Sequence, residues 1–217
     1  MNEDQSEIGP AETQERRAFR KACAAYLKTA GSKLGWRSKQ GKLFRQSGIW
    51  FVDVSAGIWL GKRKTTFEFT VKPMALVPLF WDICEIPQNR TQPLSFRSSG
   101  SWTCQPDPWA EFEISEQGLT PEKFAEQVLD LASLEMARMQ SISTEEFVDF
   151  VLTSRRFVRK AVPITALCLV GRFAEARALS LEGLGRNDGG GFGMLGTDGR
   201  VNFYDWALRW LDKQVVH

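Results

Sequence analysis

Two neighbouring stretches with a two-residue hydrophobic period constrain the fold more than any other part of the sequence. In residues 49–60 one set of alternate positions is wholly apolar, and residues 65–71 repeat the pattern over a shorter run. Such alternation is typical of β-strands that bury one face. The basic connection of residues 61–64 is short, which favours antiparallel pairing. The two stretches therefore predict the centre of an antiparallel sheet.

The alternate positions on the other face of these strands are polar at their centre, with aromatic residues at the margins. A third predicted strand, residues 109–114, adds acidic residues to this face. The polar face is either an ordinary solvated surface or a site that binds a partner or a cation through carboxylates. The candidate partner-binding residues are Asp53, Ser55, Trp59, Glu68, Trp109, Glu111 and Glu113.

Helical patterns flank the sheet. Apolar residues recur every three or four positions in residues 13–34, and a threonine–proline start signal and a capping box open later helices. The dense apolar segment 74–86 predicts a short helix over residues 78–84 or a buried irregular strand. Further helices are predicted over residues 121–140, 143–161, 164–170, 171–185 and 203–215. Additional strands are predicted over residues 35–38, 42–46 and 94–97, and a flexible loop over residues 187–199.

Together these elements predict an α+β fold. It consists of an antiparallel sheet of four to six strands, an N-terminal helix packed on one face, and a C-terminal helical region. Residues 1–12 are polar and predict a disordered tail. Residues 13–116 supply the helix and the sheet, and residues 117–217 supply a helical region packed on the sheet in the same domain. A chain of 217 residues, 43% hydrophobic, can bury such a core without disulfides.

The composition excludes several kinds of catalytic site. The one histidine, His217, is the last residue, which removes Ser-His-Asp and Cys-His catalysis and any histidine-based zinc site within the chain. The four cysteines form no CxxC pair and predict free, mostly buried thiols, although the spacing of Cys84 and Cys104 would allow a disulfide. Residues 189–193 are glycine-rich but lack the spacing of a P-loop or a dinucleotide site. We therefore predict no catalytic residue, no metal and no cofactor.

Opposite charges are sorted into separate segments. Residues 16–97 hold 16 Lys/Arg and 4 Asp/Glu, residues 107–149 hold 11 Asp/Glu and 2 Lys/Arg, and residues 155–186 hold 7 Lys/Arg and 2 Glu. These segments either neutralise each other as neighbouring faces or form a bipolar surface that steers a charged partner. The basic segment also predicts, as an alternative function, binding of nucleic acid or nucleotide. Its candidate phosphate ligands are Arg20, Lys62, Arg63 and Lys64.

Short motifs in the first half of the chain carry a family resemblance. They are LGWRSKQG at residues 34–41, LFR at residues 43–45 and FEFTV at residues 67–71, followed by a tryptophan-bearing strand and an alanine-rich helical hairpin. In this order they resemble the bacterial domain-of-unknown-function 4304 family over about residues 15–180. That family is similar to small immunity-type proteins found beside bacterial toxins, so the resemblance implies a binding role without catalysis.

The leading functional hypothesis is a non-catalytic bacterial interaction protein, an immunity- or antitoxin-like inhibitor. It would bind a partner protein through the polar sheet face and the acidic segment 107–149, with Trp59 and Trp109 as anchors. A carboxylate-dependent hydrolase that uses Asp53 and Glu68 is a second alternative to it, beside nucleic-acid binding. The sequence has neither a signal-peptide pattern nor an apolar run of membrane-spanning length, so we expect a cytoplasmic protein with no membrane partner.

Overall fold

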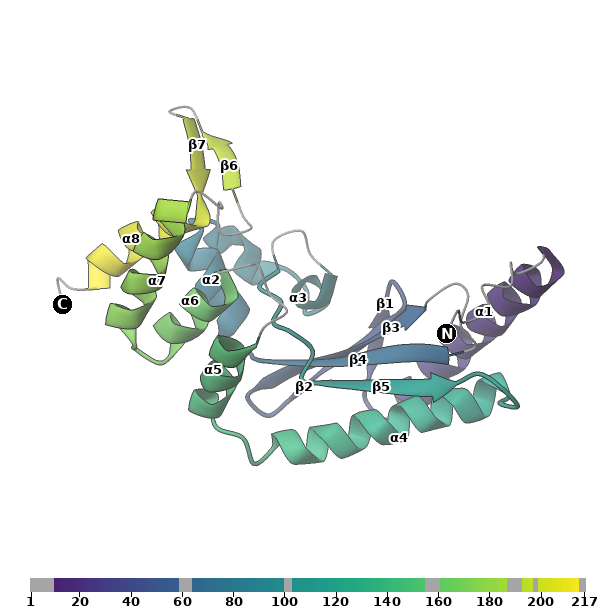
Figure 1. Ribbon diagram of the computed structural model, residues 1–217. Coiled ribbons are helices and arrows are strands. Elements are labelled where there is room, and N and C mark those ends of the chain that lie inside the picture. The colour runs from purple at the N-terminus through teal and green to yellow at the C-terminus, as the bar shows by residue number, and fades with distance from the viewer. Residues whose placement is uncertain are drawn as a thin grey trace, which may run out of the picture. The chain divides into compact units, whose positions relative to one another are not determined.

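The computed structural model describes residues 10–58, 64–99, 103–154, 161–186, 193–196 and 199–214 (Figure 1). It confirms the predicted α+β class: a five-stranded antiparallel sheet has the order β1–β2–β3–β4–β5, and β6 pairs with β7 in a second sheet. Among the helices in these ranges, none combines the length and the apolar character needed to cross a membrane.

The strands are β1 (Arg37–Lys39), β2 (Lys42–Ser47), β3 (Trp50–Ile58), β4 (Lys64–Pro73), β5 (Ala110–Ser115), β6 (Gly193–Gly196) and β7 (Gly199–Asn202). The helices are α1 (Pro10–Lys33), α2 (Leu76–Ile83), the 3-10 helix η1 (Pro87–Thr91), α3 (Phe96–Ser99), α4 (Pro121–Met139), α5 (Thr144–Thr153), α6 (Ala161–Leu169), α7 (Phe173–Arg186) and α8 (Phe203–Gln214).

The chain divides into two compact units, each assembled from separate stretches of sequence. Unit 1 combines Met1–Ser47, Phe51–Val71 and Pro108–Ser141, and unit 2 combines Gly48–Trp50, Lys72–Asp107 and Ile142–His217. The boundary predicted at residue 117 therefore falls inside unit 1, because α4 packs with the N-terminal helix. Helix α1 also begins at Pro10, within the segment predicted as a disordered tail.

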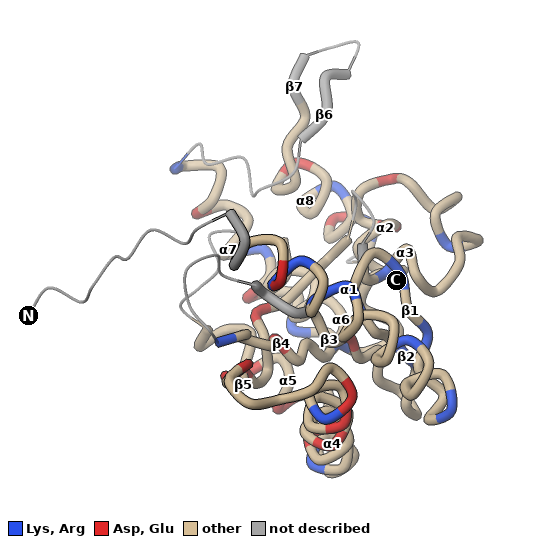
Figure 2. Tube along the Cα trace, turned by 90° about the vertical axis from the view of Figure 1, so that its right-hand side faces the viewer, with Lys and Arg blue, Asp and Glu red and all other residues tan. Residues whose placement is uncertain are grey.

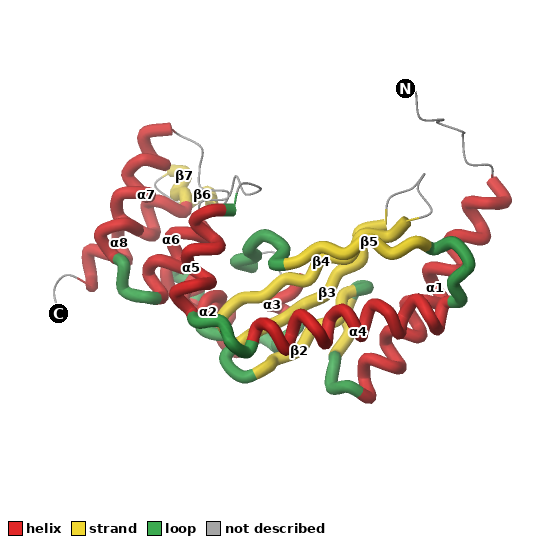
Figure 3. Tube along the Cα trace, turned by 60° about the horizontal axis from the view of Figure 1, so that its bottom comes forward, coloured by secondary structure: helices red, strands yellow, loops and turns green. Residues whose placement is uncertain are grey.

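Unit 1 is built on the contact of α1 and α4 with one face of the large sheet (Figure 3). The Phe124 ring of α4 lies at its centre, with its centroid 5.7 Å from that of Phe19 on α1 and 5.3 Å from that of Phe67 on β4. Close approach of α1 also needs a small residue at position 31, since a Cβ on Gly31 would lie 3.3 Å from the Cβ of Trp36. The N-terminal helix thus covers the apolar sheet face as predicted, and α4 shares that face.

Local signals in the sequence define several element ends. The Thr120 hydroxyl accepts a hydrogen bond from the N–H of Lys123 at the start of α4, and Pro121 occupies the first helical position. Ser143 and Glu146 form the predicted capping box at the start of α5. These caps confirm the predicted start of each helix.

The predicted turn between β1 and β2 has its physical basis in two left-handed residues. Gln40 has a φ of 51° and Gly41 a φ of 76°. Two successive positive φ angles match the twist of a tight antiparallel hairpin, and glycine adopts this conformation without steric cost. The hairpin places Arg37 opposite Phe44 and Lys39 opposite Lys42.

Unit 2 is mainly helical, and helices α2, α5, α6, α7 and α8 form its packed centre. Phe80 of α2 stacks on Phe203 of α8 with 5.7 Å between ring centroids, and Phe173 of α7 meets Trp210 of α8 edge to face at 6.0 Å. The apolar segment 74–86 contains α2, so a helix forms there and not the alternative, a buried irregular strand. The final helix, α8, lies where the sequence predicts it.

A fully buried lysine, Lys72, lies within unit 2 at the end of β4. The Lys72 ammonium donates hydrogen bonds to the carbonyl oxygens of Arg97 and Cys104, at 2.7 and 3.1 Å, and to Oε1 of Gln105, at 2.7 Å. Because an ammonium group carries three N–H donors, these three acceptors satisfy it and make its burial tolerable. The strand alternation predicts that Lys72 faces away from the core; this prediction is wrong, since the side chain is 0% exposed.

Three other predicted elements need correction. Residues 94–97 form a turn and the start of α3, in place of a strand, and the N–H groups of Phe96 and Arg97 donate to carbonyls three residues earlier. The helix predicted over residues 143–161 ends as α5 at Thr153, because Ser154 has an extended backbone. Within the loop predicted over residues 187–199, the described residues belong to the antiparallel pair β6–β7.

The packing of α7 on α8 gives a direct test of the fold. A Cβ atom on the buried Gly183 would overlap the ring of Tyr204, which is 0% exposed. We expect Gly183→Ala to lower the free energy of unfolding by about 2 kcal/mol or more, as overpacked cores do. Denaturant unfolding followed by circular dichroism measures this change.

Gly185→Ala is the matched control, since Gly185 lies on the same helix with open space around its Cβ position. There we expect a neutral effect or a gain of up to about 1 kcal/mol, because alanine favours a helix more than glycine does. Equal effects of the two substitutions would contradict the close packing of α7 and α8.

Candidate functional site

Antiparallel pairing brings three of the predicted acidic residues together on one face of β4 and β5. In the register of the two strands, Glu68 lies directly opposite Glu111, and Thr66 lies opposite Glu113. The alternate set, which includes Phe67, faces α1 and α4. Glu68, Glu111 and Glu113 therefore share the face that points away from these helices, and we call them the glutamate face.

The glutamate face is accessible, and a described ion pair lies on it. Glu111 and Glu113 are exposed and Glu68 is half-buried. Lys64 forms an ion pair with Glu113, at 2.5 Å, in which both side chains are more than half exposed. Exposed pairs of this kind contribute little to stability. Like charges directly opposite each other on a sheet are destabilising, so the Glu68–Glu111 pair opposes folding.

Asp53 does not belong to this surface, because its side chain is buried where the strand alternation predicts an accessible one. Its side chain is 1% exposed, and its neighbours Val52 and Val54 are 0% and 4% exposed. Consecutive buried residues show that both faces of β3 are covered here, and Phe51 stacks on Phe44 with ring centroids 6.2 Å apart. Burial also removes Asp53 from the proposed hydrolase pair with Glu68.

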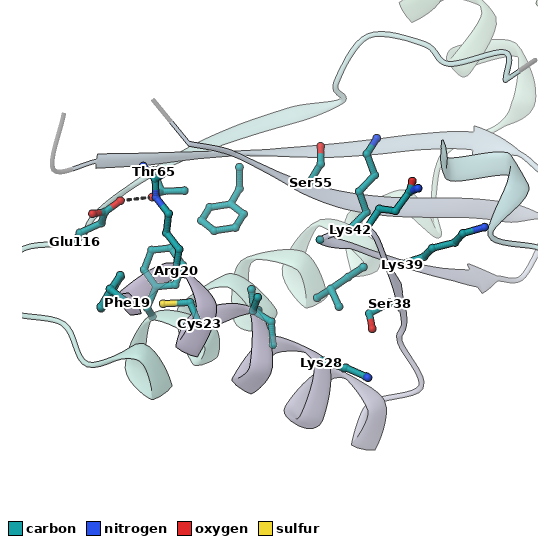
Figure 4. Close-up of a pocket in the computed structure, with 17 residues that line it drawn as sticks. Phe19, Arg20, Cys23, Lys28, Ser38, Lys39, Lys42, Ser55, Thr65 and Glu116 are labelled. Carbon is teal, nitrogen blue, oxygen red and sulfur yellow. Dashed lines mark hydrogen bonds between the residues drawn. The ribbon is translucent and has the colours of Figure 1, made fainter. Parts of the chain in front are cut away.

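The remaining predicted residues are distributed differently. Ser55 is half-buried, and its hydroxyl points away from α1 in Figure 4. Trp109 is half-buried and directly precedes β5, and its backbone N–H donates to the Phe69 carbonyl at 2.8 Å. Trp59, Lys62 and Arg63 lie outside the described residues.

The two described phosphate candidates do not converge. Arg20 lines a cavity on the helix-covered side of the sheet, together with Thr65 and Phe67. Lys64 precedes Thr65 on β4, so strand alternation places it on the opposite face, where it pairs with Glu113. Arg20 and Lys64 therefore do not form one phosphate site.

Part of the segregated charge is neutralised within unit 1. Arg16 of α1 lies 3.8 Å from Glu116, and the Tyr26 hydroxyl donates a hydrogen bond to Glu122, which lowers the pKa of that carboxyl. Figure 2 shows acidic residues along α4 and at β5 and basic residues along α1. Helix α1, from the basic segment, packs along α4, from the acidic segment, and the choice between the two charge hypotheses stays a prediction.

A shallow groove of about 530 Å³ adjoins the glutamate face between the end of β5 and α4. Apolar Ile114, Leu119 and Leu131 line it together with the carboxylates of Glu113 and Asp130. No pattern in the sequence predicts this combination, because the groove joins a strand to a helix face formed by a later segment. Its chemistry suits an apolar segment that carries positive charge.

The described residues offer little for nucleophilic or metal chemistry. Burial raises the pKa of Cys23 to about 11 and those of Cys104 and Cys168 to about 12, so these thiols are poor nucleophiles at neutral pH. The four cysteines are buried and free. Across the described ranges, no group of three or more His, Cys, Asp or Glu residues is placed to hold a metal ion.

Comparison with known proteins adds no relative. Models of known protein families, curated proteins and solved structures each gave no match to the chain. The resemblance to the domain-of-unknown-function 4304 family therefore stays a prediction.

The like-charged pair on the glutamate face predicts a gain in stability when one charge is removed. We expect Glu68→Gln to raise the free energy of unfolding by about 0.5 kcal/mol, because it relieves repulsion from Glu111 across the strands. The gain is expected to shrink in high salt, which screens exposed charges.

Glu126→Gln, on the exposed side of α4, is the control and is expected to change stability by less than about 0.5 kcal/mol. Both variants are compared by denaturant unfolding at low and high salt. A loss of stability in Glu68→Gln would show that the Glu68 side chain stabilises the fold. It would contradict a destabilising repulsion between Glu68 and Glu111.

Proposed function

We propose that the chain is a non-catalytic interaction protein that binds a cationic partner protein through the glutamate face. The observation that carries the proposal is that Glu68, Glu111 and Glu113 share one accessible face of β4 and β5, where Glu68 lies directly opposite the like-charged Glu111. A partner that supplies Lys or Arg side chains would relieve this repulsion on binding. Such complementarity favours fast association and selects against acidic partners.

The position of β5 at the edge of the sheet supports binding of an extended segment of the partner. It is the last strand in the order of the large sheet, so among the described strands only β4 pairs with it. An edge strand can accept a further strand through its backbone groups, and the side chains beside it then set specificity. Next to β5, the groove lined by Ile114, Leu131 and Asp130 offers both apolar contact and negative charge.

The form of this function that the sequence predicts is an immunity- or antitoxin-like inhibitor in a bacterial cytoplasm, and we retain it as part of the proposal. An inhibitor of a basic protein needs no catalytic group. It needs a complementary surface on a stable scaffold. The glutamate face on a five-stranded sheet is a surface of this kind.

The proposal predicts that partner capture depends on three carboxylates. Affinity capture from the native host is performed with the wild-type chain and with the triple variant Glu68→Gln, Glu111→Gln, Glu113→Gln. We expect the wild type to retain a basic protein in a stoichiometric complex and the triple variant to bind it at least tenfold more weakly. Complex formation is also expected to weaken as salt is raised.

The matched control removes three exposed glutamates elsewhere, in the triple variant Glu15→Gln, Glu126→Gln, Glu145→Gln. It carries the same change in net charge and is expected to bind the partner within about twofold of wild type. Equal weakening in both triple variants would show that only net charge matters. Failure of the wild type to retain any stoichiometric partner would contradict the proposal.

A further inference from the structure

A second candidate site lies on the other side of the sheet and does not depend on the proposed partner. It is a cavity of about 510 Å³ within unit 1, open to solvent and lined by residues of α1, the β1–β2 turn, β3, β4 and the start of α4 (Figure 4). This volume lies in the range of small-molecule sites in proteins. The interior is lined by apolar side chains of Phe19, Cys23, Leu27, Leu43, Phe67 and Phe124.

The charged residues around this cavity are mostly basic. Four cations line it, and one carboxylate, Glu116, stands against them. Glu116 is already engaged, since the Thr65 hydroxyl donates to its Oε1 at 2.6 Å and Nε of Arg16 lies 3.8 Å from its Oε2. The cavity therefore combines an apolar interior with excess positive charge. The four cations are Arg20, Lys28, Lys39 and Lys42.

Arg20 is the cavity residue with buried hydrogen-bond donors that a ligand could satisfy. Its Nε and Nη2 atoms are buried, and neither has a hydrogen-bond partner in the part of the chain that the structure describes. Buried donors that lose water without gaining an acceptor are costly. Nε and Nη2 form one edge of the guanidinium, and this edge matches the two oxygens of a carboxylate. Figure 4 shows Arg20 reaching from α1 toward Thr65.

The shape of the lining favours a chain over a compact ligand. Arg20 and Lys28 lie at opposite ends of the stretch of α1 that borders the cavity, which spans about 12 Å at the helical rise. Apolar Cys23 and Leu27 lie between them on α1. The negative charge of Glu116 close to Arg20 disfavours a doubly charged phosphate, so a singly charged head group fits this end better.

We propose that this cavity binds a medium-chain carboxylate amphiphile of the fatty-acid class. The carboxylate accepts two hydrogen bonds from Nε and Nη2 of Arg20, and the alkyl chain runs along Cys23 and Leu27 toward the β1–β2 turn. The three lysines at that end attract the anion from solution but do not hold its head group. The sequence alone indicates Arg20 only as a phosphate ligand. It does not reveal the cavity, because the β1–β2 turn that borders the cavity lies on a separate segment of the chain.

The test is calorimetric titration of the full chain with decanoate, below the concentration at which it forms micelles. Decanol and decyltrimethylammonium serve as probes with the same chain and a neutral or positive head. We expect saturable binding of decanoate at least tenfold tighter than binding of either of the other probes. Arg20→Met, which keeps the alkyl stem, is expected to weaken decanoate binding by about 10- to 100-fold and to leave decanol unchanged. Arg20→Lys is expected to restore part of the loss.

Two further variants make the outcome decisive. Arg17→Met removes an exposed cation of α1 that does not line the cavity and is expected to leave decanoate binding within twofold of wild type. Ala24→Phe places a ring into the cavity from an exposed helix position and is expected to abolish binding. Circular dichroism verifies that each variant is folded.

A second readout locates the ligand. Cys23 lines the cavity and Cys168 lies in unit 2, and both thiols react slowly because they are buried. Bound decanoate is expected to slow the alkylation of Cys23 further and to leave that of Cys168 unchanged. Equal affinity for decanoate and decanol, an unchanged affinity in Arg20→Met, or equal losses in Arg20→Met and Arg17→Met would each overturn the proposal. These results leave partner capture by the glutamate face unaffected, since the two sites lie on opposite faces of the sheet.

Discussion

The packing of Phe124 is the interaction on which unit 1 depends. Its ring contacts Phe19 of α1 on one side and Phe67 of β4 on the other, with centroid separations of 5.7 and 5.3 Å. One aromatic side chain thus joins the first helix, the sheet and a helix that follows about a hundred residues later along the chain. Aromatic contacts of this kind combine a large buried area with a defined ring geometry. This contact holds α1 and α4 together on the helix-covered face of the sheet.

The sheet separates two polar features that the core does not explain. On one face, α1 and α4 leave a cavity in which Arg20 keeps two buried nitrogen atoms without described partners. On the other face, Glu68 and Glu111 oppose each other across β4 and β5. Each arrangement costs folding free energy, and each is suited to a ligand of the opposite charge. The Arg20 cavity is the basis for the proposed carboxylate site, and the glutamate face is the basis for the proposed partner site.

Not every unusual polar residue in the molecule indicates a binding site. Lys72 is completely buried, but three acceptors in unit 2 satisfy its ammonium group, so its position has a structural explanation. The cysteines are also buried, and the raised pKa of Cys23 fits a thiol that reacts slowly at neutral pH. Satisfaction of hydrogen bonds distinguishes Lys72, which supports the fold, from Arg20, whose buried edge lacks an acceptor.

The sequence by itself determined those features that depend on neighbours a few residues away. The alternation of β4 and β5, the caps at Thr120 and Ser143, and the turn at Gln40 were all predictable, because short-range geometry and hydrogen bonds control them. The alternation also indicated which face of these strands carries Glu68 and Glu111. Side-chain direction on a strand depends only on the residue's place in the two-residue period.

Only the tertiary structure decided which of these residues are accessible and which come together. Alternation predicted an exposed Asp53, but the second face of β3 is covered and the side chain is buried. Nothing local showed that α4 joins unit 1, or that Arg20 and Lys39 line one cavity. Burial and cavities arise from contacts between segments far apart along the chain, and a periodic pattern records a residue's direction but not what covers it.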